Sequence, residues 1–317
     1  MDYFCEKPVL LIFFNRPDTF EKVFEKVKEV KPKHLILAQD GPRNDNDKIG
    51  IEKCRKIAEN IDWECEVIKD YSDKNLGCGV RPMSAITNAL ERFEDVIVLE
   101  DDCVPSLSFF RYCEEMLERY KDDQRISYIS GLNHFEEWDC GGNDYFFTKT
   151  GAIWGWATWR RAWTPYYDYY VNGISDEYTL KLLKQQFPKK STFKNKIDAW
   201  TKANESFETG EKLSYWDSQW GFVKYSQSMM VIVPKKNLIH NIGIGAGSTH
   251  AKILESHTFK KYKTFVFIPT HELEFPLKHP KHVVCDGGYD NLVYRASTKT
   301  PIRKFLGRIV KKILNKG

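Results

Sequence analysis

Residues 96–102 read Val96-Ile97-Val98-Leu99-Glu100-Asp101-Asp102. Four branched apolar residues in a row are typical of a short strand that is buried on both faces, as the strands of a parallel sheet are. This strand leads directly into three carboxylates. Adjacent anions repel one another and are costly to hold beside an apolar sheet unless a cation neutralises them. The stretch therefore predicts a buried strand whose carboxyl end binds a cation.

The cation that suits this cluster is Mg²⁺ or Mn²⁺, which is usually held by one or two carboxylates together with substrate phosphates and water. An isolated Glu-Asp-Asp is more often a solvated turn before a helix, so the neighbouring sequence has to support the site. Along an extended strand Glu100 and Asp102 point to one side and Asp101 to the other. We therefore expect one or both of Glu100 and Asp102 to bind the metal, and Asp101 to face a ribose or the loop.

Strands and helices alternate over the first hundred residues. Apolar runs at 9–14, 34–38, 65–68 and 96–99 predict strands, and apolar side chains at helical spacing lie between them. This order predicts an α/β fold with a mostly parallel, Rossmann-like sheet and right-handed crossovers. The alternation ends near residue 140. We expect a nucleotide-sugar-binding half at 1–140, an acceptor-side half of the same domain at 141–285, a linker at 286–300 and a C-terminal helix at 301–317.

Polar loops follow three of the early strands: Asn15-Arg16-Pro17, Gln39-Asp40-Gly41 and the acidic cluster. The carboxyl ends of parallel strands meet at one edge of a sheet, where ligands of open α/β folds bind. Arg16 suits a phosphate or a base, and Asp40 suits a base or a ribose. Each of the first two loops alone is ordinary turn chemistry. Together with the acidic cluster they favour a nucleoside diphosphate site.

The overall composition excludes several classes of protein. The chain has 317 residues, is 42% hydrophobic and 14% aromatic, and has a net charge of +4. A globular protein fits these values, and nothing in the net charge indicates nucleic-acid binding. The eight cysteines form no C-x-x-C pair, which favours reduced thiols. No signal peptide or membrane-spanning stretch is evident, so we expect a cytoplasmic protein.

An aromatic segment and an aspartate stand out in the second half. Tryptophan and tyrosine crowd residues 154–170, and most such side chains form core. We expect the remainder, Trp154 and Trp156 together with Trp216, to stack on sugar rings. Asp217 follows Trp216 and is either a helix N-cap or a general base that accepts the proton of an acceptor hydroxyl.

Two further signals lie near the end of the chain. The glycine-rich stretch 245–250 has the freedom of a lid, and in it His250 is a surface residue, a phosphate contact or a metal ligand. Residues 301–317 carry apolar side chains at i, i+3, i+4 and i+7 with lysine and arginine between them. This pattern indicates a helix that lies on an anionic membrane surface, although packing on its own domain or a partner is the alternative.

The chain resembles the GT-A-fold glycosyltransferases, and most closely the N-acetylglucosaminyltransferase I type and its bacterial relatives. The resemblance covers most of residues 8–250, although 75–81 match poorly. It rests on the three loops above, on Phe109-Phe110 after the Glu-Asp-Asp, and on Gly155-Trp156, Trp216-Asp217 and Gly245-Ala246-Gly247-Ser248-Thr249-His250.

The resemblance implies roles for individual residues. Asp102 would contact the metal, Arg16 and Asp40 would bind the nucleotide, Asp217 would be the catalytic base, and Ser248 would lie in a loop that closes over the donor. We extend nucleotide-sugar binding to Glu100 and Asp101, and metal binding to Glu100 and His250.

These expectations combine into one function. The chain is expected to transfer a sugar from a nucleotide-sugar, with UDP as the nucleotide, to a glycan or lipid-linked acceptor with inversion. The setting would be bacterial surface polysaccharide synthesis at the inner face of the cell membrane. Two alternatives remain open: a sugar nucleotidyltransferase, which uses a similar sheet and Mg²⁺, and a non-catalytic glycan-binding or scaffold protein.

Overall fold

The computed structural model describes residues 3–210, 215–243 and 268–298. Ser248, His250 and the helix expected at 301–317 lie outside these ranges. The strands are β1 (Val9–Phe13), β2 (His34–Gln39), β3 (Glu66–Tyr71), β4 (Asp95–Glu100), β5 (Cys103–Pro105), β6 (Ile126–Ser130), β7 (Tyr145–Thr148), β8 (Trp156–Trp159), β9 (Met230–Pro234) and β10 (Ile239–Asn241). The helices are α1 (Pro17–Val30), α2 (Asp45–Ala58), α3 (Gly77–Arg92), α4 (Ser108–Arg119), α5 (Arg160–Trp163), η1 (Asn172–Ser175), α6 (Glu177–Gln185), α7 (Lys190–Thr209), α8 (Asp217–Ser226) and α10 (Gly287–Thr298).

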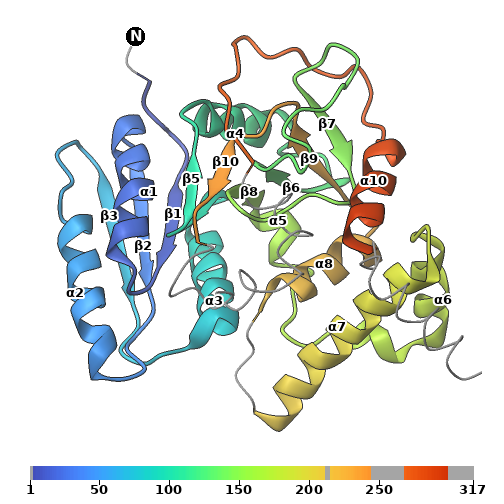
Figure 1. Cartoon of the computed structure of the whole chain (residues 1–317), viewed down its shortest axis with the longest axis horizontal. Helices are drawn as coiled ribbons and strands as arrows, with labels where there is room; N and C mark the ends of the chain where they lie inside the picture. The colour runs from blue at the N-terminus through green and yellow to red at the C-terminus, as the bar shows by residue number, and fades with distance from the viewer. Residues whose placement is uncertain (1–2, 211–214, 244–267, 299–317) are drawn as a thin grey trace, which may run out of the picture.

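Eight of these strands form one sheet in the order β3-β2-β1-β4-β8-β6-β9-β7 (Figure 1). The pairings β3·β2, β2·β1, β1·β4 and β6·β9 are parallel, and β8 and β7 pair antiparallel to their neighbours. The short strands β5 and β10 pair antiparallel in a separate sheet. The prediction of an α/β fold with a mostly parallel, Rossmann-like sheet is confirmed.

Helices cover both faces of the sheet. Helices α1, α2 and α4 share one core with Val9 and Leu11 of β1. Helices α3, α5, α8 and α10 share a second core with Leu10 and Ile12 of the same strand. Successive residues of β1 thus enter opposite cores, which explains why its sequence is apolar without interruption.

Helices α6 and α7 form a smaller lobe beside the second core, at the lower right of Figure 1. The lobe has its own apolar centre, in which Trp200 of α7 is fully buried. The Trp200 Nε1 donates to Ser218 O at 2.9 Å, and its ring packs edge-on against Phe222, with centroids 5.1 Å apart. These contacts fix α7 along α8.

The polar stretch at 286–300, expected to be a linker, instead contains helix α10. Asp286 Oδ1 accepts from Tyr289 N at 2.9 Å at the start of this helix. Tyr289 is fully buried, and Val293 is 8% exposed on the same side one turn later. Only a few apolar side chains of this helix face the core, so its sequence is polar overall and its composition resembles that of a linker.

Strands β7 and β8 lie in the aromatic region for which no strand was predicted. Both are buried along their whole length, so they lack the alternation that marks a half-exposed strand. Within the described residues, no helix has the length and apolarity needed to cross a bilayer.

Candidate functional site

The carboxyl ends of β1, β2 and β4 meet at one edge of the sheet. Strand β1 lies between the other two, with Phe13 opposite Gln39 and Ile12 opposite Glu100. Arg16 follows β1, Asp40 follows β2, and the acidic cluster ends β4. The sheet therefore brings together the three loops that the sequence predicted would meet.

Arg16 bridges two of the three carboxylates. Its Nη2 donates to Asp101 Oδ1 and, at 2.9 Å, to Asp102 Oδ2. The other oxygen of Asp101 accepts from Phe14 N at 3.2 Å. The expectation that Asp101 and Asp102 point to opposite sides is wrong, because β4 ends at Glu100 and strand alternation does not extend into the turn.

Glu100 is the carboxylate that this arrangement leaves without a partner. No hydrogen bond or ion pair reaches its side chain from the described part of the chain. Burial, with repulsion from Asp102 and Asp101, raises its pKa to about 8. Burial likewise raises the pKa of Asp101 to about 6, although Arg16 opposes the shift. One guanidinium thus fails to neutralise three crowded carboxylates.

The donor chemistry at this edge fits Mn²⁺ or Mg²⁺. Glu100 and Asp102 offer two oxygen-donor groups, and such ions complete their coordination with diphosphate oxygens and water. Among residues 3–210, 215–243 and 268–298, no three His, Cys, Asp or Glu side chains are arranged to hold a metal unaided.

The segment after β10 packs directly onto Asp102. Ile242 N donates to Asp102 O at 2.8 Å, and Asn241 Nδ2 lies 3.5 Å from Asp102 Oδ1. A Cβ on Gly243 would lie 1.9 Å from Asp102 Oδ2. A glycine is required here because any side chain would displace the carboxylate. Residues 241–243 thus contact a predicted metal ligand; the sequence analysis did not single them out, and the neighbouring glycine-rich stretch was the available signal.

Asp40 holds the loop that opens α3. Its carboxylate accepts from Gly41 N at 2.9 Å, from Leu76 N and Gly77 N at 2.8 Å each, and from Asn75 Nδ2 at 3.0 Å. Asp40 is 6% exposed. In the described structure its oxygens orient the 75–77 backbone, and direct nucleotide binding by Asp40 stays a prediction.

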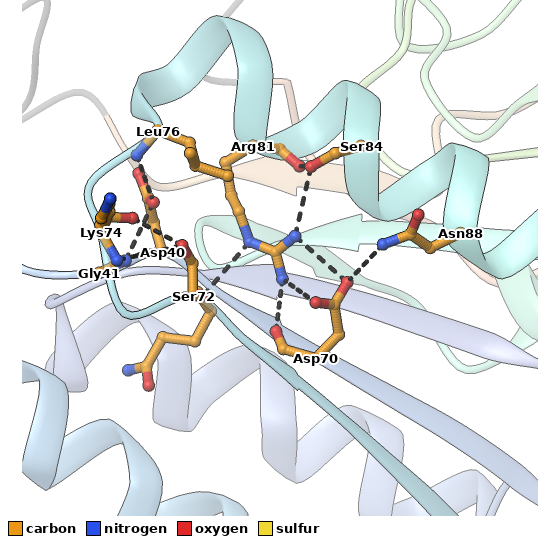
Figure 2. Close-up of polar contacts among 10 residues, drawn as sticks. Asp40, Gly41, Asp70, Ser72, Lys74, Leu76, Arg81, Ser84 and Asn88 are labelled. Atoms are coloured by element: carbon orange, nitrogen blue, oxygen red, sulfur yellow. Dashed lines mark hydrogen bonds and ion pairs between the residues drawn. The ribbon is translucent and has the colours of Figure 1, made fainter.

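Arg81, inside α3, contacts Asp70 near the end of β3, as Figure 2 shows. It forms an ion pair with Asp70 at 3.1 Å, and its Nε donates to Gln39 O at 3.3 Å. It also donates from Nη1 to Ser84 Oγ at 3.4 Å. Arg81 is 3% exposed, so one buried guanidinium joins the ends of β2 and β3 to α3. No motif pointed to this residue.

Asp217 is the first residue of α8 and is exposed. The N-cap position is Trp216, and no side chain caps the helix. The alternative in which Asp217 caps the helix is therefore not supported. Its charge contributes to the raised pKa of Glu100 after the larger effects of burial, Asp102 and Asp101. The charge of Asp217 thus acts on the acidic edge, and its role as a base stays a prediction.

The three tryptophans assigned to sugar stacking differ in exposure. Trp154 is partly exposed, whereas Trp156 is fully buried and Trp216 is 4% exposed. The rings of Trp156 and Trp216 stack on each other with centroids 5.7 Å apart. Trp154 is therefore the member of this set with a free surface, and sugar stacking by all three stays a prediction.

The sequence matches no protein-family profile and no curated protein. Similar solved structures include TarS 1–349 from S. aureus, at 12% identity and a TM-score of 0.40, covering 74% of this chain and 60% of TarS 1–349. HddC from Yersinia pseudotuberculosis is 12% identical with a TM-score of 0.30, covering 49% of this chain and 77% of HddC. UDP-glucose pyrophosphorylase complexed with UDP-glucose is 11% identical with a TM-score of 0.35, and the match covers 81% of this chain and 99% of the pyrophosphorylase chain. At these values the likeness assigns neither activity nor substrate to this chain.

Proposed function

We propose that the protein is a metal-dependent glycosyltransferase that moves a sugar from a UDP-sugar to a glycan or lipid-linked acceptor. The observation that carries the proposal is the unpartnered Glu100 carboxylate beside the Arg16–Asp101–Asp102 cluster, at the ligand-binding edge of the sheet. The excess negative charge there matches a divalent cation with a bound diphosphate. The resemblance to the N-acetylglucosaminyltransferase I type supports the same assignment.

Each residue has a distinct task in this proposal. Glu100 and Asp102 hold Mn²⁺ or Mg²⁺, which when bound stabilises negative charge on the leaving diphosphate. Arg16 leaves its bridge to the carboxylates and contacts the donor's phosphates. Asp217 accepts the proton of the acceptor hydroxyl, and attack from the side opposite the diphosphate inverts the anomeric carbon.

The loop after β1 argues against the nucleotidyltransferase alternative. Only Phe14, Asn15 and Arg16 separate β1 from α1. These three residues include no glycine, so the loop lacks the glycine-rich backbone that cradles a triphosphate in many phosphate-binding loops.

Titration calorimetry tests the donor site. We expect UDP to bind wild type with Mn²⁺ and to bind at least tenfold more weakly with EDTA. Asp102→Asn should remove the Mn²⁺ dependence, whereas Asp62→Asn, at an exposed position, should not. If neither UDP nor GDP binds folded wild type with Mn²⁺, the transferase assignment is wrong and the scaffold alternative gains support.

We further propose that residues 301–317 attach the enzyme to the inner face of the cell membrane, near a lipid-linked acceptor. Lysine and arginine near an anionic surface each contribute about 1 kcal/mol. The full chain should sediment with phosphatidylglycerol vesicles and much less with phosphatidylcholine vesicles. Lys311→Glu/Lys312→Glu should weaken this binding at least tenfold, and equal sedimentation of both proteins would refute the proposal.

A further inference from the structure

Lys224, Trp156 and Trp220 all lie close to the ring of Tyr128. The side chain of Lys224 is 5% exposed, and its Nζ lies 5.8 Å from the centroid of the Tyr128 ring. Trp156 and Trp220 pack against the same ring at 5.7 and 6.2 Å, and the Nε1 of each is buried without a hydrogen-bond partner in the described residues. Buried donors are rarely left unpaired, because an unpaired buried group loses its hydrogen bonds to water without gaining others.

No carboxylate pairs with Lys224. No salt bridge or hydrogen bond reaches its ammonium group from the described residues. The anion whose charge acts on it is Asp290, but Asp290 already accepts from Thr148 Oγ1, from Thr150 Oγ1 at 2.8 Å and from Lys149 N at 3.0 Å. The Asp290 carboxylate is thus already hydrogen-bonded to residues 148–150.

A second lysine adds to this positive charge. Lys196 lies on α7 one turn before Trp200, which hydrogen-bonds to α8, so both side chains lie on the same side of α7. Lys196 is half-buried and forms no ion pair within the described residues. Burial, followed by repulsion from Lys196, lowers the pKa of Lys224 to about 7. Lys196 and Lys224 therefore repel each other, and neither forms an ion pair within the described residues.

Lys224 and Lys196 lie near Asp217, the proposed catalytic base. Asp217 and Lys224 are at the two ends of α8, about 10 Å apart along the helix axis at 1.5 Å per residue. Trp156 stacks on Trp216, the residue before Asp217. The charge of Asp217 acts on Lys196 and on Tyr128. Lys224 therefore lies about 10 Å along α8 from the proposed base, and the charge of that base acts on Lys196.

We propose that Lys224 and Lys196, with the N–H groups of Trp156 and Trp220, form a subsite for an acidic group of the acceptor, which is therefore an anionic glycan. This inference rests on the proposed glycosyltransferase function and names the substrate class of the same site. A phosphate or a carboxylate supplies the missing acceptors and neutralises the lysines. The acidic group binds there while the reacting hydroxyl lies at Asp217.

The test is direct titration of two anions, inorganic phosphate and glucuronate, into the full-length protein by calorimetry at pH 6.5 and constant ionic strength. Saturable binding of phosphate indicates a phosphorylated acceptor, and saturable binding of glucuronate indicates a uronic-acid acceptor. Lys224→Met and Lys196→Met should each weaken the binding at least tenfold. Lys202→Met, at an exposed position of α7, should leave it unchanged.

Three results would overturn the proposal: no saturable binding of either anion to wild type, equal binding by both lysine variants and wild type, or a parallel loss of UDP affinity in Lys224→Met. The last result would assign the lysines to the donor. If Lys224→Met does not fold, the half-buried Lys196→Met decides the question alone. Failure of UDP to bind wild type, with anion binding intact, would instead overturn the proposed function and leave the anion site standing.

Discussion

Replacing Glu100 with glutamine should stabilise the metal-free protein, and the gain should depend on pH. Burial of the Glu100 carboxylate, followed by repulsion from Asp102 and Asp101, raises its pKa from 4.5 to about 8. Between these two values the folded protein holds a proton that the unfolded chain releases. The stability of wild type must therefore fall as pH rises from about 5 to about 8.

The size of this effect follows from the pKa shift. A shift from 4.5 to about 8 corresponds to an upper bound of about 5 kcal/mol, since each unit is worth about 1.4 kcal/mol. Glu100 is partly exposed, and solvent screening reduces the value. We expect Glu100→Gln to be about 2 kcal/mol more stable than wild type at pH 8.5, with a much smaller difference at pH 5.

Urea unfolding followed by circular dichroism, in EDTA at both pH values, measures this difference. Glu91→Gln, on the exposed side of α3, is the matched control and should follow wild type. Adding Mn²⁺ and UDP at pH 8.5 should raise the free energy of unfolding of wild type but should not raise that of Glu100→Gln. If the free energy of unfolding depends on pH equally in wild type and Glu100→Gln, the raised pKa of Glu100 does not control stability and the argument is refuted.

Three other substitutions test the surroundings of the site. Gly243→Ala should lower Mn²⁺-dependent UDP affinity at least tenfold in calorimetry, because its methyl group displaces the Asp102 carboxylate; an unchanged affinity would contradict the contact. Arg81→Met should cost about 3 kcal/mol in urea unfolding because it leaves Asp70 without its cation, and adding Asp70→Asn should recover part of the loss. Trp163→Ala removes a 1%-exposed ring that stacks on Tyr167 and should lower the free energy of unfolding by about 3–5 kcal/mol in the same urea assay. A loss below about 1 kcal/mol would contradict this expectation and show that the core closes around the gap.

Strands β1, β2 and β4 could be predicted from the sequence because they are buried on both faces. Continuous apolar runs such as Val9–Phe13 mark these strands without reference to any partner. Strand β8 is equally buried, but it lies among aromatic residues that also suit a core or a sugar site. Its place between β4 and β6 depends on pairing across more than fifty residues, which no local pattern records.

The candidate site was predictable to the extent that it follows strand ends. Arg16 and the acidic cluster meet because β1 and β4 are parallel neighbours. The partner of Asp101 could not be predicted, since it depends on where β4 ends and the turn begins. Lys224 was also missed, because one lysine in an aromatic helix resembles a surface residue until packing shows it to be 5% exposed.

The two halves of the site carry unbalanced charges of opposite sign. At the donor edge, Glu100, Asp101 and Asp102 face one arginine and have negative charge in excess. Beside α8, Lys196 and Lys224 have positive charge in excess, and Asp217 acts electrostatically on both regions. In a low-dielectric interior neither excess is stable without a counterion. A cation-bound diphosphate would neutralise the first region and an acidic acceptor the second, so the charge distribution itself keeps two anionic substrates in separate places on either side of the proposed base.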